Sequence, residues 1–311
     1  MFRNTCKILM NNFSLTWKIL LYKVIVFIGV MGLTTVVCLP IINTLAAQDF
    51  FGFLQTNVSN LLLNFNLNVL IETIFIIIQK FFEIINASGY LVFSICALSI
   101  TIIVYYYISS LCELAVVDEL NSFMSSNYKL GFVSRFVSNF RKSLNFGLIK
   151  LITVFIIDLI IILGAAALYY ITAKVIYFIA PIIVILFLII MFALRITIFA
   201  CTKAAIVVNG VNPFKAFKMN LKAISKKFIQ VFSNILVILA LVLILNMFAM
   251  FFTFGATALI TLPLSMLFII IFENVVYYEN NGMRYYCDNQ TFVIPKKLEE
   301  QDSLKKVIDI I

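Results

Sequence analysis

The sequence predicts an all-α fold, a polytopic membrane helix bundle with about six transmembrane helices. Three observations predict it. The chain is 63% hydrophobic and 12% charged, with a mean hydropathy of +1.10, whereas a soluble domain is about half apolar and about a quarter charged. Its apolar residues gather in runs near or above the ~20 residues that cross a bilayer core. Basic residues flank alternate runs, as expected of cytoplasmic loops.

The first apolar run begins near Ile19 and has no small-residue cleavage pattern before Pro40, so we interpret it as an uncleaved span. The later runs are separated by polar or basic segments, and each is long enough to cross a bilayer. The predicted spans are about 19–39, 90–111, 151–170, 175–200, 231–252 and 257–276.

The distribution of positive charge predicts the orientation. Of the 23 Lys and Arg residues, only Lys80 and Lys174 fall on the outer side when both termini are placed in the cytoplasm. The bias toward Ile, Phe, Asn and Lys is typical of a low-GC bacterium, so we expect the bacterial cytoplasmic (inner) membrane. We assign 1–276 to a multi-pass membrane domain and 277–311 to a cytoplasmic tail, in which Asn281-Gly282 between tyrosine-rich arms favours a short hairpin.

The segment 67–85 is long and apolar but carries Glu72, Gln79, Lys80 and Glu83. On a helical wheel one narrow polar stripe is formed by Asn68, Glu72, Gln79, Glu83 and Asn86. A seventh span here would reverse every later loop and place the Lys-rich stretches outside. We therefore predict an outer-face amphipathic insertion at 40–89, lying on or dipping into the outer leaflet. The alternative, a stripe that lines a cavity, stays open.

Basic amphipathic helices are predicted on the cytoplasmic side before the third and fifth spans. Asn212 and Pro213 are typical of an N-cap and a first helical position. Such helices bind anionic lipid headgroups. The predicted lipid contacts are Arg135, Arg141 and Lys142 before the third span, and Lys215, Lys218, Lys222 and Lys226 before the fifth. Because a similar stretch precedes the first span, we also formulate the hypothesis of three parallel repeats of surface helix, outward span and inward span.

Two charges lie inside predicted spans. Asp158 in the third span and Arg195 in the fourth fall at similar depth if the two helices pack as an antiparallel hairpin. Intramembrane charges are costly and face protein or a water-filled cavity. We interpret the two residues as an intramembrane ion pair, with a transport or proton site as the alternative. Glu273 is expected at an inner helix end, exposed to headgroups.

Several kinds of chemistry find no support in the sequence. The chain has no His, which removes the commonest metal ligand and acid–base residue. Its six Cys have no C-x-x-C spacing, so no zinc site or disulfide framework is expected. We predict no catalytic residues, metal or cofactor, and hence no enzyme. The net charge of +9 is explained by topology and lipid contact, so no nucleic-acid partner is expected.

The stretch 192–218, from Phe192-Ala193-Leu194-Arg195 through Asn209-Gly210-Val211-Asn212-Pro213, is followed by two spans. It resembles the membrane domain of bacterial glycerophosphoryl diester phosphodiesterases and related multi-pass proteins, over about the last 90 residues. In those enzymes the reaction belongs to a separate soluble barrel. No part of this sequence resembles that barrel. The resemblance implies a stand-alone membrane module.

We therefore expect a non-catalytic, multi-pass membrane protein that binds anionic lipid headgroups, or another membrane or cytoplasmic protein, through its cytoplasmic helices. The alternative is a permease or exporter subunit for a small solute or lipid, suggested by Asp158 and by the three repeats. A hydrated cavity that reaches Asp158 would favour transport, and a solid bundle would favour binding.

Overall fold

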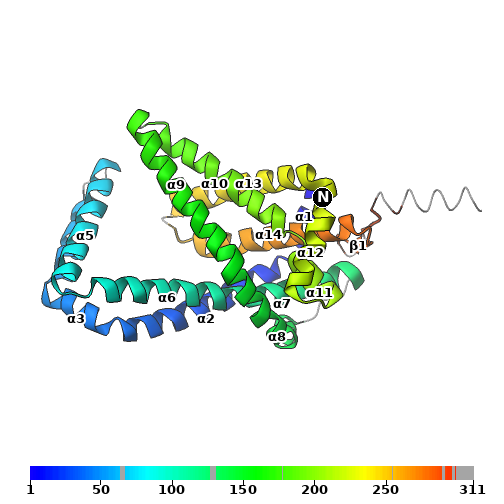
Figure 1. The fold of residues 1–311 in the computed structure, drawn as a ribbon, viewed down its shortest axis with the longest axis horizontal. Coiled ribbons are helices and arrows are strands. Elements are labelled where there is room, and N and C mark those ends of the chain that lie inside the picture. The colour runs from blue at the N-terminus through cyan, green and yellow to red at the C-terminus, as the bar shows by residue number, and fades with distance from the viewer. Residues whose placement is uncertain are drawn as a thin grey trace, which may run out of the picture. The chain divides into compact units, whose positions relative to one another are not determined.

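The computed structural model describes residues 1–63, 67–126, 131–176, 178–253, 255–288, 291–295 and 298. Nearly all of the described residues lie in helices (Figure 1), which confirms the predicted all-α class. Six helical segments in the described part of the chain are long and apolar enough to cross a membrane. They are Ser14–Val37, Leu91–Ser126, Phe132–Val175, Ala180–Asn209, Phe228–Thr253 and Ala258–Asn280.

These six segments correspond in order to the six predicted spans, so the protein is a multi-pass membrane protein. Their outer faces carry large exposed aliphatic and aromatic side chains, including Ile25, Ile160 and Phe251. A bilayer core is as apolar as these side chains and accommodates them without cost. Helix α5 (Leu67–Ala87) carries Glu72, Lys80 and Glu83 and is not one of the six.

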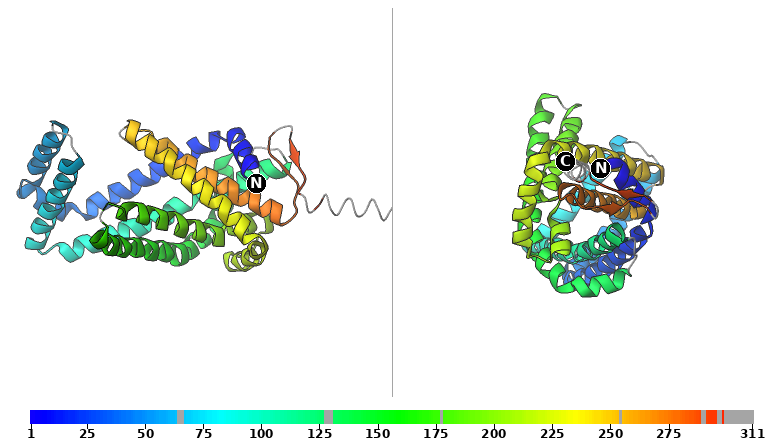
Figure 2. Two further views of the ribbon diagram at one scale, coloured as in Figure 1. Left: turned by 90° about the horizontal axis from the view of Figure 1, so that it is seen from above. Right: turned by 90° about the vertical axis from the view of Figure 1, so that its right-hand side faces the viewer.

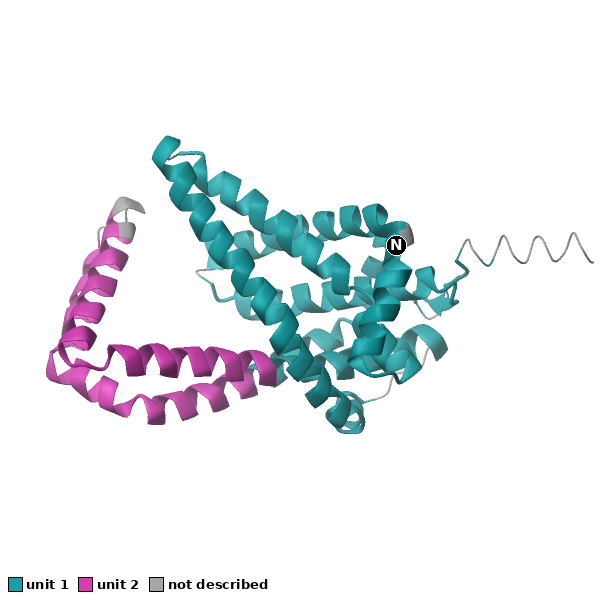
Figure 3. Ribbon diagram, in the orientation of Figure 1, with its two compact units in different colours: residues 1–23, 109–311 teal, residues 24–108 magenta. Residues whose placement is uncertain are grey.

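The chain forms two compact units, coloured separately in Figure 3. The smaller unit, Val24–Ile108, contains most of α2 (Ser14–Val37) and α6 (Leu91–Ser110), together with α3 (Leu39–Ala47), α4 (Phe50–Leu63) and α5. Ile41, Phe50 and Ile85 belong to its own buried cluster. The hydroxyl groups of Thr34 and Thr101 lie 3.1 Å apart and join α2 to α6.

The larger unit, Met1–Lys23 and Ser109–Ile311, contains the main core. In it α9 and α10 lie side by side, as do α13 and α14 (Figure 2), and α1 packs on α14. Helix α7 is its most buried element. The α-helices that lie wholly in this unit have the following bounds: α1 (Phe2–Asn11), α7 (Cys112–Ser126), α8 (Phe132–Lys150), α9 (Ile156–Val175), α10 (Ala180–Phe199), α11 (Thr202–Asn209), α12 (Pro213–Ile224), α13 (Phe228–Thr253) and α14 (Ala258–Asn280).

Three of the long segments are interrupted. Leu111 separates α6 from α7, and Ala200 with Cys201 separates α10 from α11. A π-helical turn, η1 (Leu151–Phe155), joins α8 to α9, and such turns inside α-helices are frequent at functional sites. The sequence prediction ended the second and fourth spans near these breaks, but the chain continues as a helix beyond both.

The predicted start of the helix at Pro213 is observed. Asn212 has extended backbone, its carbonyl accepts a 2.9 Å hydrogen bond from the N–H of Ala216, and α12 begins at Pro213. A short 3-10 turn, η2 (Ser225–Lys227), leads into α13. In the repeat hypothesis each repeat has a surface helix followed by two spans. The helices in the corresponding positions are α1, α2 and α6 in the first repeat, α8, α9 and α10 in the second, and α12, α13 and α14 in the third. The repeat hypothesis stays a prediction.

The predicted hairpin at Asn281-Gly282 is wrong. Gly282 has φ of +64°, and the N–H of Met283 donates to the carbonyl of Tyr278 over 2.8 Å. This is a Schellman motif that ends α14. The strand pair comes later, where β1 (Tyr285–Tyr286) pairs antiparallel with β2 (Phe292–Val293). Tyr285 is fully buried, so the first part of the predicted tail packs into the core.

Candidate functional site

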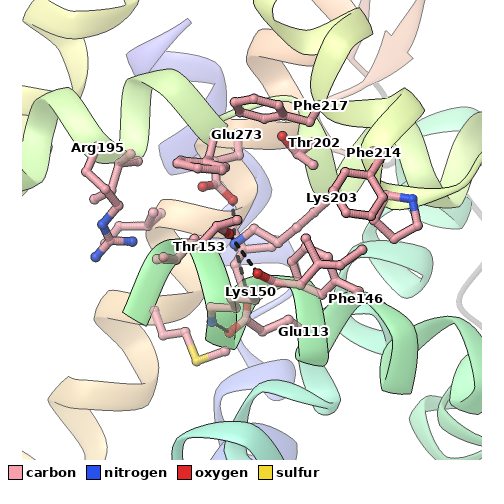
Figure 4. Close-up of a pocket in the computed structure, with 18 residues that line it drawn as sticks. Glu113, Phe146, Lys150, Thr153, Arg195, Thr202, Lys203, Phe214, Phe217 and Glu273 are labelled. Atoms are coloured by element: carbon pink, nitrogen blue, oxygen red, sulfur yellow. Dashed lines mark hydrogen bonds and ion pairs between the residues drawn. The ribbon is translucent and has the colours of Figure 1, made fainter. Parts of the chain in front are cut away.

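A cavity of about 550 Å³ lies in the larger unit, within the usual range of ligand sites. Figure 4 shows the side chains around it. Most of its wall is apolar and aromatic, and its polar groups come from five helices and the π-helical turn. The lining polar residues are Glu113 of α7, Lys150 of α8, Thr153 of η1, Arg195 of α10, Thr202 and Lys203 of α11, and Glu273 of α14.

Four of these charges form one cluster, Glu113, Lys150, Lys203 and Glu273, hereafter the four-charge cluster. Lys203 Nζ lies 2.7 Å from Glu273 Oε2 and 3.3 Å from Glu113 Oε2. Lys150 Nζ donates a short hydrogen bond to Glu113 Oε1. Figure 4 shows the Lys203 side chain reaching between the two carboxylates. Two ammonium groups therefore match two carboxylates.

The helix breaks place these residues. Glu113 is the second residue of α7 and Lys203 the second residue of α11, so each follows directly on an interruption of a span. Lys150 is the last residue of α8, where the π-helical turn begins. The cluster consequently links four helices that are far apart in sequence.

The four-charge cluster is almost completely removed from solvent, with the Glu113 and Glu273 side chains 8% and 6% exposed. Taking charges out of water costs several kcal/mol for each ion, and only good pairing offsets that cost. Loss of a single member leaves its partner buried and uncompensated. The cluster therefore favours one packing of these helices over alternatives that separate its members.

Asp158 and Arg195, the predicted ion pair, lie side by side. Arg195 Nε is 3.0 Å from Asp158 Oδ1, and the guanidinium carbon is 5.5 Å from the centre of the Phe192 ring. Arg195 also lines the cavity, whereas Asp158 is not among the lining residues. The pair therefore borders the cavity through its cation only.

A second, smaller cavity of about 170 Å³ adjoins the first, and its lining residues other than Arg195 are apolar. Arg195, Phe199 and Phe217 line both cavities. Ile157 and Ile161 of α9 and aliphatic side chains of α10 form the rest of its wall. We call it the apolar slot.

Two polar groups at the main cavity have unused hydrogen-bonding capacity within the described part of the chain. Thr202 is 5% exposed, and its Oγ1 atom has no hydrogen-bond partner there. Arg195 engages Asp158 through Nε, and no described residue accepts a hydrogen bond from its Nη groups. A buried hydroxyl without a partner is unfavourable by about 1–3 kcal/mol, so these groups are the natural contacts for a bound ligand.

The predicted lipid-contact cations fall into two groups. Lys215, Lys218 and Lys222 are exposed along α12, and Arg141 and Lys142 are exposed on α8. The side chain of Lys226 lies outside the described part. The opposite face of α12 is buried through Ala216, Asn220 and Ile224.

Arg135 has a different environment from the other predicted lipid contacts. Its Nη1 donates to Asp118 Oδ2 over 2.9 Å and its Nη2 donates to Ser122 Oγ over 2.6 Å. Asn139 donates to the same Asp118 oxygen over 2.7 Å. The guanidinium is engaged within the protein because α7 places a buried carboxylate beneath α8, which the sequence alone does not reveal.

Glu273 was expected near headgroups, and that expectation is wrong. Helix α14 continues to Asn280, so Glu273 lies two turns inside it and is 5% exposed. Lys150 and Lys203 belong to the basic residues that the positive-inside distribution places in cytoplasmic loops, which is a sufficient explanation of them from the sequence. The overlooked signal was an acidic residue, Glu113, directly after an apolar run in a segment that stays apolar.

No group of His, Cys, Asp and Glu in the described ranges is arranged to hold a metal ion. The six cysteines are free. Burial raises the pKa of the Cys287 thiol to about 11, and burial also raises the pKa of Cys6. Neither thiol is therefore activated as a nucleophile.

The chain was compared with known proteins in three ways. No family model, no curated protein and no solved structure matched it. The functional argument therefore depends on the cavity and the charged surfaces.

Proposed function

We propose that the protein is a non-catalytic membrane module that binds anionic lipid through its cytoplasmic surface. The observation that supports this is the surface of α12. Lys215, Lys218 and Lys222 are exposed beside the exposed apolar side chains Phe214 and Leu221. A helix with this arrangement lies in the headgroup layer, where each lysine contributes about 1 kcal/mol with anionic lipid.

In this proposal the protein resides in the cytoplasmic (inner) membrane of a bacterium, with both termini in the cytoplasm. The positive-inside distribution supports this orientation, since it places α8 and α12 at the cytoplasmic leaflet, which carries the anionic lipids. The resemblance to the membrane domain of glycerophosphoryl diester phosphodiesterases is part of the same proposal, because it too implies a module without its own reaction.

The test uses the complete protein in nanodiscs of defined composition. The triple variant K215Q K218Q K222Q should reduce the enrichment of phosphatidylglycerol around the protein, and high salt should reduce it for the unaltered protein as well. The matched control is K80Q K174Q, which removes two lysines on the predicted outer side, for comparison with the double variant K215Q K218Q. Equal enrichment in the two double variants would contradict the proposal.

A second candidate function, a permease or exporter subunit for a small solute or lipid, is favoured by the cavity with its buried four-charge cluster. Reconstituted protein would then move a labelled lipid or solute across liposomes at a rate that depends on Lys203. Lipid binding without flux supports the module, and flux that the K203M variant abolishes supports the transporter.

A further inference from the structure

We propose that the main cavity binds the phosphate of an anionic membrane lipid and that the apolar slot takes part of one of its acyl chains. This inference deepens the proposed function, because it assigns a specific lipid site distinct from the exposed α12 surface. Its basis is the combination, in adjoining spaces, of unused hydrogen-bond donors, a lining guanidinium whose paired carboxylate does not line the cavity, and an apolar extension.

The donors suit an anion. Thr202 Oγ1 is buried without a partner at the cavity, and the Nη groups of Arg195 donate to no described residue. The planar guanidinium binds phosphate through two parallel N–H donors. A phosphate oxygen would also satisfy the Thr202 hydroxyl, which water or a neutral ligand would do more weakly.

The charge also suits a phosphodiester. Lys150, Lys203 and Arg195 line the cavity with Glu113 and Glu273, so the lining has three cations and two carboxylates. With Asp158, 3.0 Å from Arg195, the charges of this region balance. The carboxylate that balances Arg195 belongs to Asp158, which is not among the lining residues. The cavity therefore presents the cation of this pair and not its carboxylate, which suits an anionic ligand.

The apolar surfaces favour a lipid over a soluble phosphate. Phe146, Phe199, Phe214 and Phe217 line the main cavity, and a small hydrated anion would leave these rings facing water. The apolar slot shares Arg195 and Phe199 with the main cavity. Arg195 therefore lies where the two spaces meet, which is where the headgroup of a lipid joins its chains.

Pro213, Phe214 and Phe217 bring the start of α12 to the cavity. In the proposed orientation α12 lies at the headgroup layer, so a lipid would enter from the cytoplasmic leaflet without crossing the membrane. The same helix would then recruit anionic lipid with its exposed lysines and contribute to the specific site.

Native mass spectrometry of the complete protein in a mild detergent tests the site by titration with phosphatidylglycerol, with phosphatidylcholine and with inorganic phosphate. The unaltered protein should retain phosphatidylglycerol most tightly. The T202V variant should bind it about tenfold or more weakly, because one hydrogen bond to a charged group is lost. The matched control is T197V, since Thr197 is a buried threonine of α10 outside the cavity.

Two further variants test the guanidinium and the cavity volume separately. D158N R195Q removes the guanidinium without leaving an unpaired buried charge and should weaken binding, whereas I269W should block it by filling the cavity. Equal retention of both phospholipids, retention of phosphate alone, or unchanged binding in T202V and I269W would each overturn the inference.

The result is separable from the test of the proposed function. K215Q K218Q K222Q should lower surface enrichment but leave the tightly bound lipid in place, and T202V should do the reverse. If the triple variant alone removes the retained lipid, the cavity is not the site even though lipid binding itself is supported.

Discussion

The side chain of Asn220 bridges the break between α10 and α11 by accepting a 2.9 Å hydrogen bond from the backbone N–H of Cys201. Its amide also donates to the carbonyl of Ile198. Asn220 is 1% exposed, so one α12 side chain satisfies two backbone groups at the interruption that positions Lys203. The packing of α12 and the four-charge cluster are thereby coupled.

We expect N220A to destabilise the protein, because each buried backbone group left unpaired costs about 1 to 3 kcal/mol. The measurement is thermal unfolding in detergent, followed with a thiol-reactive dye that detects the buried Cys112 and Cys201 as they become accessible. N234A is the control, since Asn234 is half-buried and its amide donates to the carbonyl of Gln230 in its own helix, away from any helix break. Equal thermal unfolding midpoints for N220A and N234A would contradict the stabilising role of Asn220 at the helix break.

K203M should destabilise more than any other single replacement in the four-charge cluster. Lys203 contacts both Glu113 and Glu273, and its removal leaves buried carboxylates without their shared cation, at a cost of about 3 to 5 kcal/mol. K203M E273Q should recover part of the loss because one carboxylate is neutralised. The prediction fails if the double variant unfolds at the same temperature as K203M.

D158N should lower the unfolding temperature, and D158N R195M should restore much of it. Removal of one partner leaves a buried charge unpaired, whereas replacement of both can be nearly neutral. The side chains of Arg195 and Asp158 are 23% and 18% exposed, so the penalty should be smaller than for K203M. A stable D158N variant that loses a cellular phenotype would favour the transport alternative.

The raised pKa of Cys287 predicts that the stability of the protein changes at alkaline pH. Burial raises its pKa from 9.0 to about 11, so the folded state holds the thiol proton more tightly than the unfolded chain does. The resulting stabilisation is complete below pH 9 and declines as the pH rises from 9 to 11. Unfolding midpoints over this range should fall less steeply for C287S than for the unaltered protein. Parallel curves would show that Cys287 titrates normally.

The orientation can be tested with single cysteines at Ser59, Thr172 and Ser225 in a cysteine-free background. An impermeant thiol reagent applied to intact cells should label the first two positions and not the third, because basic loops remain in the cytoplasm. Disrupted cells provide the control in which Ser225 must also react. Labelling of the cysteine at position 225 in intact cells would contradict the predicted orientation.

The sequence predicted the spans because length and hydropathy are local properties that a bilayer imposes on each helix separately. The proximity of Asp158 and Arg195 was also predictable, since the two residues have similar predicted depths on consecutive helices joined by a short connection. The prediction of each span depends on one helix only, and the prediction of the ion pair depends on one helical hairpin only.

The four-charge cluster was not predictable in the same way. Its members come from α7, α8, α11 and α14, and their meeting depends on how interrupted helices pack. Lysine beside a span has a sufficient explanation in topology, so Lys150 and Lys203 gave no distinct signal. The hairpin prediction at Asn281-Gly282 failed for a related reason, because the same dipeptide serves a tight turn or a helix C-cap, depending on whether the preceding residues remain helical.

The packing of α1 on α14 has a consequence for synthesis. The rings of Phe2 and Phe268 lie 6.0 Å apart, and Asn4 donates to the hydroxyl of Tyr285 over 2.8 Å. Helix α1 thus acquires these neighbours only after α14 and the residues that follow it have been synthesised. At about 5–20 residues per second, this interval is on the order of 15 to 60 seconds. During that time the side of α1 that carries Ile8 lacks the contacts that bury it in the folded chain, and slower elongation would prolong this state.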